Sequence, residues 1–251
     1  MKNILSLISV CAILSCAEGK NLLRNSSFEL GRAEFGIRRY VRQRNPKHFQ
    51  EPVFDTMEKI HGKQSIRFDN PGGDVIELVS REYKLIPGRG YTFSWYMKSS
   101  EPVDIRAGQY AGEMVTPTFS DWSMFTARNF RTSTQWKRHS ITFTAKGKRS
   151  WYFTFFRWDR KGKPSSASVW FDALQIREGK DLLPYAPSAP AEGAVCGDRR
   201  VRFPGETLPC ELRLVNYTDR PRPIHARLEI RDTLMPEIPF PGRTISQTVP
   251  P

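Results

Sequence analysis

Pairs of carboxylates are the residues of this chain whose type and spacing could support catalysis. Hydrolysis of a glycosidic bond uses two carboxyl groups about 5 to 9 Å apart, and spacing alone allows Glu77 with Glu82 or Glu113 with Asp121. Nothing around either pair singles it out. The chain has no G-x-S-x-G, H-E-x-x-H or P-loop pattern, and its four histidines leave few of the usual general bases. We therefore expect no catalytic residue in this segment.

Aromatic side chains offer a different chemistry, the stacking of a flat ring on a flat ligand. In the stretch 151–158, WYFTFFRW, both parities of a strand carry aromatic residues, and Phe156 and Trp158 share one of them. A strand with a single core-facing side does not need aromatics on both sides. Either one set is available for stacking, or a loop covers it. Trp122 lies in a polar segment without a strand pattern, which makes it a candidate for contact with a ligand.

Positive charge dominates the composition, since 39 Lys and Arg against 26 Asp and Glu give a formal net charge of +13. Such a charge favours solubility and permits polyanionic partners. The densest basic stretch, residues 38–48, could bind sulfate or carboxylate groups through bidentate arginines, or it could be a solvated loop. We expect no nucleic-acid partner, because none of the usual binding modules is present.

The beginning of the chain is typical of an export signal. Lys2 precedes an apolar run, 4–14, that is too short to span the roughly 30 Å hydrocarbon core of a bilayer. Small residues ending at Ala17 are spaced for ordinary signal cleavage, whereas the ILSC motif resembles a bacterial lipobox, in which Cys16 becomes the lipid-anchored first residue. We assign residues 1–17 to the signal, and the lipobox alternative retains Cys16 as the first residue of the mature chain. They place the rest of the chain in the periplasm, on the cell surface or outside the cell.

The exported body retains two cysteines, Cys196 and Cys210. In an oxidising compartment they could form a disulfide that closes a loop of about 15 residues and contributes roughly 3 kcal/mol in the chain-entropy model. The alternative is two unpaired buried thiols. A zinc site is disfavoured, because there is no C-x-x-C pair and the histidines are scattered.

The body of the chain shows short β-type runs separated by Gly, Pro, Asn and Asp, with almost no helical periodicity. In YTFSWYMK, residues 91–98, alternation places Tyr96 and Lys98 on the face opposite the core. Trp95 and Trp170 are expected in the core. Further strands are expected at 64–68, 75–85, 103–109, 136–145, 151–158 and 167–176. Seven or more such strands predict an all-β sandwich or jelly roll.

The composition changes after Gly179, where closely spaced prolines favour an extended connection. We place the first domain at 19–187 and a linker at 188–192. The remainder, 193–251, alternates like the opening strands of an immunoglobulin-like sandwich, a fold that needs about 100 residues. A partial immunoglobulin-like domain is therefore expected. Either the chain is a piece of a longer protein, or its tail is incompletely ordered.

Four stretches together resemble a known family. They are NLLRNSSFE at 21–29, HGKQSIR at 61–67, PGRGYTFSWYMKS at 87–99, and VWFDALQI at 169–176 with LPY at 183–185. In this order they resemble the carbohydrate-binding modules of the merged families four, nine and twenty-two, which are galactose-binding-like jelly rolls. The resemblance covers residues 21 to about 187 and implies sugar binding, although a fold by itself does not prove a function.

A structural calcium ion is the first implication of this resemblance. The matching positions are Glu29 and Asp172, with backbone carbonyls near Lys63 and Ser65. Calcium takes six to eight hard oxygen ligands, which carboxylates and loop carbonyls supply. The alternative is that the two carboxylates cap turns or pair with nearby arginines.

A sugar site is the second implication. It needs an aromatic face for the C–H side of a pyranose and polar groups for the hydroxyls. The expected ligand is a polysaccharide or oligosaccharide, acidic if the arginines of 38–48 take part. We expect Arg106 to join Tyr96 and Lys98 from a neighbouring strand. The full set of expected contacts is Tyr96, Lys98, Arg106, Trp122, Phe156 and Trp158.

These observations favour a non-catalytic carbohydrate-binding module of an exported bacterial protein, forming the N-terminal part of a larger glycan-degrading enzyme. One alternative is a structural or adhesive spacer that binds no sugar. The other is part of a glycoside hydrolase whose activity resides outside this segment.

Overall fold

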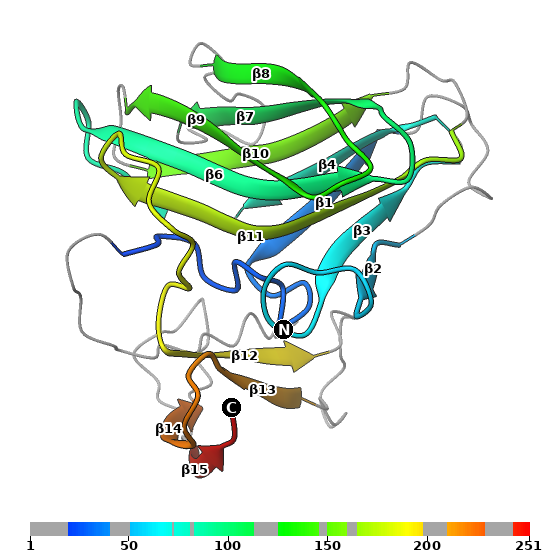
Figure 1. Ribbon diagram of the computed structural model, residues 1–251. Helices are drawn as coiled ribbons and strands as arrows, with labels where there is room; N and C mark the ends of the chain where they lie inside the picture. The colour runs from blue at the N-terminus through cyan, green and yellow to red at the C-terminus, as the bar shows by residue number, and fades with distance from the viewer. Residues whose placement is uncertain are drawn as a thin grey trace, which may run out of the picture. The chain divides into compact units, whose positions relative to one another are not determined.

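The computed structural model describes residues 20–40, 51–71, 73–80, 83–112, 125–145, 150–159, 165–197, 210–228 and 243–251. This part of the chain consists of antiparallel strands joined by turns and loops (Figure 1). It divides into two compact units, one spanning 17–188 and the other including 189–251. The division lies at the predicted linker, 188–192, whose last residues already belong to strand β12. No helix that could cross a bilayer occurs among the described residues.

The larger unit is a sandwich of two antiparallel sheets (Figure 1). Sheet A has the order β1 (Phe35–Tyr40), β4 (Val75–Ser80), β10 (Ser150–Asp159), β7 (Asp104–Gly112) and β8 (Phe125–Arg131), and β5 (Tyr83–Lys84) pairs with β10. Sheet B has the order β2 (Val53–Asp55), β3 (Ser65–Asp69), β11 (Ser168–Glu178), β6 (Gly90–Ser99) and β9 (Lys137–Thr144). The predicted all-β jelly-roll sandwich is confirmed. Every predicted strand of this unit is present, whereas β1, β2 and β8 were not predicted.

The core between the two sheets is built from alternate residues of their strands. In β6, Tyr91, Phe93, Trp95 and Met97 all belong to the hydrophobic core between the sheets. Tyr96 and Lys98 on the opposite face are half-buried, whereas Thr92 and Ser94 of that face are buried as well. The ring of Trp95 stacks on that of Phe93 with centroids 4.6 Å apart. Aromatic pairs at such separations add about 0.5–1.5 kcal/mol beyond the burial of their area.

The first asparagine of the NLLRNSSFE motif fastens the N-terminal segment to the end of the sandwich. The Asn21 side-chain oxygen accepts a hydrogen bond from Ile176 N at 3.0 Å, and its nitrogen donates to Leu174 O at 3.0 Å and Ala186 O at 3.2 Å. The buried amide therefore hydrogen-bonds backbone groups far along the chain. Burying those groups without hydrogen-bond partners would cost free energy. This part of the motif is scaffolding.

The smaller unit contains two ribbons, β12 (Ala191–Gly197) with β13 (Cys210–Asn216), and β14 (Arg222–Leu228) with β15 (Arg243–Val249). Two-stranded ribbons are compatible with many β folds, so the immunoglobulin-like domain stays a prediction.

The predicted disulfide is not formed, because Cys196 is a free cysteine. The register pairs Cys196 with Glu211 and Cys210 with Gly197. Neighbouring strand positions alternate between the two faces of a ribbon, so the two cysteine positions belong to opposite faces. A disulfide needs two Cβ atoms that point toward each other.

Candidate functional site

Two of the aromatic residues predicted to contact a ligand lie in the core instead. Phe156 is 2% exposed and Trp158 3% exposed, and the Phe156 ring stacks on that of Phe171 at 3.8 Å between centroids. The reason is a β-bulge, because the pairing of β10 shifts register between Thr154 and Phe156. A bulge adds one residue and changes which side chains face inward. Phe155 and Phe156 therefore both enter the core, and the prediction for Phe156 and Trp158 was wrong.

The other predicted contact residues do not form one site. Tyr96 and Lys98 lie on the outer face of sheet B, as alternation predicted. Arg106 lies on β7 of sheet A, so it cannot join them from a neighbouring strand, and that prediction was wrong. Trp122 lies outside the described residues.

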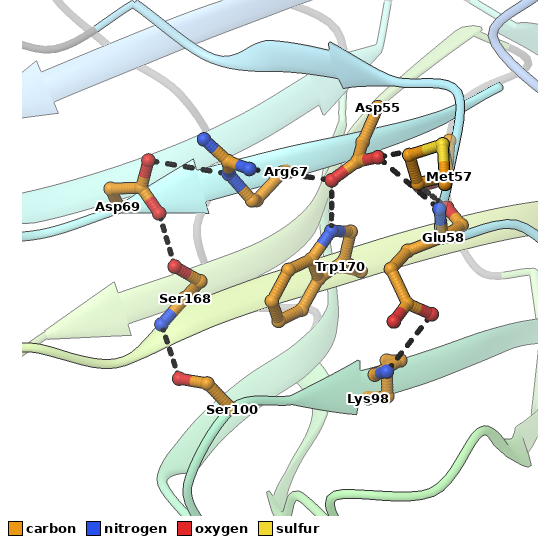
Figure 2. Close-up of polar contacts among 10 residues, drawn as sticks. Asp55, Met57, Glu58, Arg67, Asp69, Lys98, Ser100, Ser168 and Trp170 are labelled. Atoms are coloured by element: carbon orange, nitrogen blue, oxygen red, sulfur yellow. Dashed lines mark hydrogen bonds and ion pairs between the residues drawn. The ribbon is translucent and has the colours of Figure 1, made fainter.

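A polar cluster surrounds Trp170 on the outer face of sheet B (Figure 2). The indole nitrogen donates to Asp55 Oδ2 at 2.9 Å, and Lys98 Nζ lies 5.2 Å from the ring centroid. Lys98 also pairs with Glu58 Oε2 at 2.9 Å, while Arg67 Nη1 donates to Asp55 Oδ2 at 3.3 Å. Trp170 is therefore half-buried on the surface, which contradicts its predicted place in the core. Its polar neighbours already bind one another, so the cluster anchors the chain between β2 and β3.

The chain after β11 covers more of the outer face of sheet B. Arg138 Nη2 donates to Leu183 O at 2.6 Å, and Gln175 Nε2 donates to Pro184 O at 3.3 Å. The Arg138 guanidinium lies 5.7 Å from the Tyr96 ring centroid. The ring of Tyr96 and the polar groups beside it are thus engaged by the protein itself, which leaves little of this face for a ligand.

The outer face of sheet A carries a different arrangement, which we call the arginine row. Cross-strand pairing aligns Arg38 of β1 with Glu77 of β4, Glu77 with Arg157 of β10, Arg157 with Arg106 of β7, and Arg106 with Asn129 of β8. The strand neighbours of Glu77, Arg106 and Arg157 are core residues, so these three side chains belong to the outer face. At about 4.8 Å per strand, the row extends roughly 19 Å.

Glu77 and Arg157 form the fixed centre of the arginine row. Arg157 Nη1 donates to Glu77 Oε1 at 2.8 Å, and Nη2 donates to Asp159 Oδ2 at 3.3 Å. The Glu77 side chain is only 3% exposed, and its Oε2 has no hydrogen-bond partner in the described part of the chain. An acceptor left without a donor in such a position costs about 1–3 kcal/mol. Arg38 and Arg106 at either side are exposed.

Sequence reasoning considered Glu77 only as one of a catalytic pair and did not consider Arg157 at all. A signal existed, because each is a charged residue inside an otherwise apolar or aromatic strand, VIELVS or WYFTFFRW. A charge in such a setting needs a partner. Of the basic stretch 38–48, residues 41–48 lie outside the described residues, as do Glu82, Glu113 and Asp121.

Glu29 and Asp172, the predicted calcium ligands, lie against the loop that connects β2 to β3. Asp172 Oδ2 accepts from Ile60 N at 2.7 Å and from His61 N at 2.9 Å. Burial raises the pKa of Asp172 to about 7, and the nearby Glu29 charge adds to this rise. Burial also raises the pKa of Glu29.

A buried carboxyl group whose ionisation is disfavoured by burial and by a neighbouring carboxylate suits a bound cation. The described residues contain no group of three His, Cys, Asp or Glu side chains that could hold a metal ion, so oxygens from the backbone or water would have to complete the shell. Carboxylate oxygens such as those of Glu29 and Asp172 are of the ligand type that calcium prefers. At Lys63 the structure presents the N–H to Glu29 Oε1, at 2.8 Å, and Ser65 donates its hydroxyl to Glu58 O.

Gly62 allows the Glu29 carboxylate to approach this loop. Its φ is +71°, and a Cβ there would collide with the Glu29 carboxylate. We expect Gly62→Ala to lower the free energy of unfolding by about 1–3 kcal/mol, because alanine is strained at positive φ and displaces Glu29. Urea denaturation measures the loss. Gly88→Ala is the matched control, since its φ is +83° and nothing lies within 4 Å; an equal loss in both variants would contradict the role of Glu29.

No protein-family model matches the chain, and no curated protein matches it. Among solved structures, a family 61 carbohydrate-binding module in complex with β-1,4-galactotriose is similar at 14% identity, covering 64% of this chain and 99% of its own, with a TM-score of 0.46. A CBM22-1 xylan-binding domain of Paenibacillus barcinonensis is similar at 15% identity, covering 67% of this chain and 100% of its own, with a TM-score of 0.41. At these identities the likeness concerns the fold alone.

Proposed function

We propose that the unit at 19–187 is a non-catalytic module that binds a polysaccharide through the outer face of sheet A. The four ordered motifs that resemble carbohydrate-binding modules support the class of ligand. The arginine row supports the choice of this face as the binding site, and it is the observation on which the proposal rests. It extends across strands β1, β4, β10, β7 and β8 and combines guanidinium donors with a carboxylate acceptor, which suit sugar hydroxyl groups.

The outer face of sheet B is the less suitable surface. Its aromatic residues Tyr96 and Trp170 already contact Arg138 and Lys98, and the segment around Leu183 binds to its polar groups. A ligand there would have to displace contacts within the protein, which reduces affinity.

The test is affinity electrophoresis through gels that contain one polysaccharide each, neutral or acidic. We expect at least one polysaccharide to retard the protein. Arg38→Gln with Arg106→Gln should abolish most of the retardation, because this removes the two exposed arginines that flank Glu77 and Arg157. Thr142→Ala, an exposed change on β9 of sheet B, is the control and should leave the retardation intact. Unretarded migration in every gel would contradict the proposal and favour a structural or adhesive spacer.

The wider setting is part of the same proposal. The apolar signal supports export, with Cys16 as a lipid anchor if the ILSC motif is processed as a lipobox. Modules of this kind are commonly attached to catalytic domains, so the chain is proposed to be the N-terminal part of a larger glycan-degrading enzyme.

Glu29 and Asp172 are proposed to hold a structural calcium ion, with backbone oxygens near Lys63 and Ser65. When bound, calcium supplies positive charge between two carboxylates. The protein's own residues tie the N-terminal segment, the loop before β3 and strand β11 together at this point. In this proposal the calcium site stabilises the fold, whereas the arginine row contacts the sugar.

A further inference from the structure

The exposed apolar side chains of the larger unit are concentrated on two segments. Among the described residues, six large apolar side chains are exposed. One of them, Ile86, begins the turn before β6. Single exposed apolar residues are normal on a protein surface, whereas a group of them marks an interaction surface. The other five lie on β2, on the loop that follows it or on the chain after β11, and we call them the apolar rim: Val53, Met57, Ile60, Leu182 and Leu183.

Contacts within the protein bring the two segments of the apolar rim together. The ring of His61, in the loop after β2, meets the edge of the Tyr185 ring, in the chain after β11, with centroids 4.6 Å apart. The N-terminal segment contacts both of them. Ser26 Oγ shares a hydrogen bond with Tyr185 Oη at 2.8 Å, and Glu29 Oε1 accepts from Lys63 N at 2.8 Å. The rim is therefore continuous with the segment by which the chain enters the sandwich.

The protein fixes the backbone of the apolar rim and leaves its side chains outside. Met57 N donates to Asp55 Oδ1 at 2.9 Å, and Ile60 N donates to Asp172 Oδ2 at 2.7 Å. Leu183 O accepts from the guanidinium group on β9 at 2.6 Å. Nevertheless, Met57 is 86% exposed. Apolar side chains on a backbone that is already held lose less conformational entropy when a partner buries them.

Unpaired positive charges border the apolar rim. Lys59 lies between Met57 and Ile60 in the loop after β2, Lys180 precedes Leu182 by two residues, and Arg24 belongs to the N-terminal segment. All three cations are exposed, and none of them forms an ion pair in the described part of the chain. A surface that combines apolar and basic side chains is complementary to an apolar interior behind a negatively charged layer.

Acidic groups offset only part of this charge. Glu58 pairs with Lys98 Nζ at 2.9 Å. Glu29 is half-buried and accepts backbone N–H groups from the loop. Asp181 is exposed beside Lys180. The border of the rim therefore keeps a positive balance.

The proposed lipid anchor points to the partner of the apolar rim. Asn21 Nδ2 donates to Ala186 O at 3.2 Å, in the same segment as Leu182 and Leu183. Cys16 precedes Asn21 by five residues, a stretch that spans at most about 18 Å. A lipid on Cys16 would therefore hold this part of the sandwich close to a bilayer.

We infer that the apolar rim is a membrane-docking surface, which inserts its side chains into the headgroup region of an anionic phospholipid bilayer while the bordering cations contact lipid phosphate groups. Docking of this kind requires apolar side chains beside basic ones and no partner of matching shape, which is what a loop and an extended segment offer. The inference goes beyond the proposed sugar site and uses no residue of the arginine row.

Co-sedimentation with lipid vesicles tests the inference on the exported chain, residues 17–251, prepared without lipid. Vesicles of phosphatidylglycerol mixed with phosphatidylcholine are compared with vesicles of phosphatidylcholine alone. We expect binding to the anionic vesicles that falls as salt rises. Met57→Ser with Leu182→Ser should weaken this binding by about tenfold or more, because two inserted side chains are lost. Lys59→Gln with Lys180→Gln should weaken it by roughly tenfold.

Ile86→Ser is the matched control, because Ile86 is 48% exposed and lies outside the apolar rim. It should bind vesicles like the wild type. Urea denaturation should show equal stability for all these variants, since every changed side chain is exposed. Polysaccharide retardation should also be equal in Met57→Ser with Leu182→Ser and in the wild type, so failure of the sugar site and failure of the membrane surface are separate results.

Three outcomes would overturn the inference. They are equal binding to anionic and neutral vesicles, unchanged binding in the Met57→Ser, Leu182→Ser variant, and no binding to either kind of vesicle at millimolar lipid. A concentration-dependent dimer that the same variant dissociates, without binding to vesicles, would also overturn it and would assign the apolar rim to an interface between two copies of the chain.

Discussion

Replacement of Phe156 by alanine should lower the free energy of unfolding of the sandwich by about 3–5 kcal/mol and leave its affinity for polysaccharide unchanged. The ring is 2% exposed and lies between the sheets, where it stacks on Phe171 at 3.8 Å and meets the edge of Trp95 at 5.5 Å between centroids. Its removal leaves a cavity in a closely packed core, and the surrounding side chains can close it only in part.

Urea denaturation followed by tryptophan fluorescence measures the loss, and titration calorimetry measures affinity at a temperature where the variant is folded. Phe156→Leu is the graded control, because it fills most of the volume and should cost less than half as much. A Phe156→Ala variant with wild-type stability and no binding would show that the ring contacts ligand after all.

Alternation predicted one of the two aromatic strands well and the other poorly. In β6, Tyr91, Phe93, Trp95 and Met97 keep one parity throughout, so a period of two identifies the buried face. In β10, the register shift near Phe156 changes the parity partway along the strand. A bulge depends on how a strand pairs with its neighbour, and the sequence of β10 alone does not contain that information.

The site residues were even harder to predict from the sequence. Trp170 looks like a core residue because it is a tryptophan in an apolar strand. It faces outward because it alternates with Val169 and Phe171, which lie in the core, and its indole N–H donates to Asp55 on β2. The arginine row is assembled from five strands whose order in sheet A differs from their order in the chain. Composition predicted a basic protein, but only the register of the strands places Arg157 opposite Arg106.

The N-terminal motif could be predicted as a unit but not explained from the sequence. Its resemblance to carbohydrate-binding modules suggested sugar binding, whereas Asn21 and Asn25 prove to hold backbone groups of the scaffold. Such residues are a signature of the fold, because the fold needs them to hydrogen-bond its backbone groups. They say less about the ligand, because their side-chain groups bind backbone groups of the protein itself.

In the absence of calcium, raising the pH from about 4 to about 8 should destabilise the larger unit by about 4 kcal/mol through Asp172 alone. Burial raises the pKa of this carboxyl from 3.8 to about 7, and a difference of about 3 pKa units corresponds to about 4 kcal/mol. The sign follows from the raised value: the folded state holds the proton more tightly than the unfolded chain. The stabilisation is complete below pH 4 and is lost as the pH rises through 7. The raised pKa of Glu29 acts in the same direction.

Calcium should reverse this loss at pH 8, because a cation between the two carboxylates favours their ionised forms and binds only the folded state. The measurement is the free energy of unfolding at pH 5 and pH 8, each with EDTA and with millimolar calcium. Asp172→Asn is the matched variant, since the amide keeps the shape and does not titrate. It should lose most of the pH dependence and the response to calcium. Equal pH slopes in the variant and the wild type would contradict the assignment to Asp172, whereas a wild type that responds to pH and not to calcium would contradict the metal site alone.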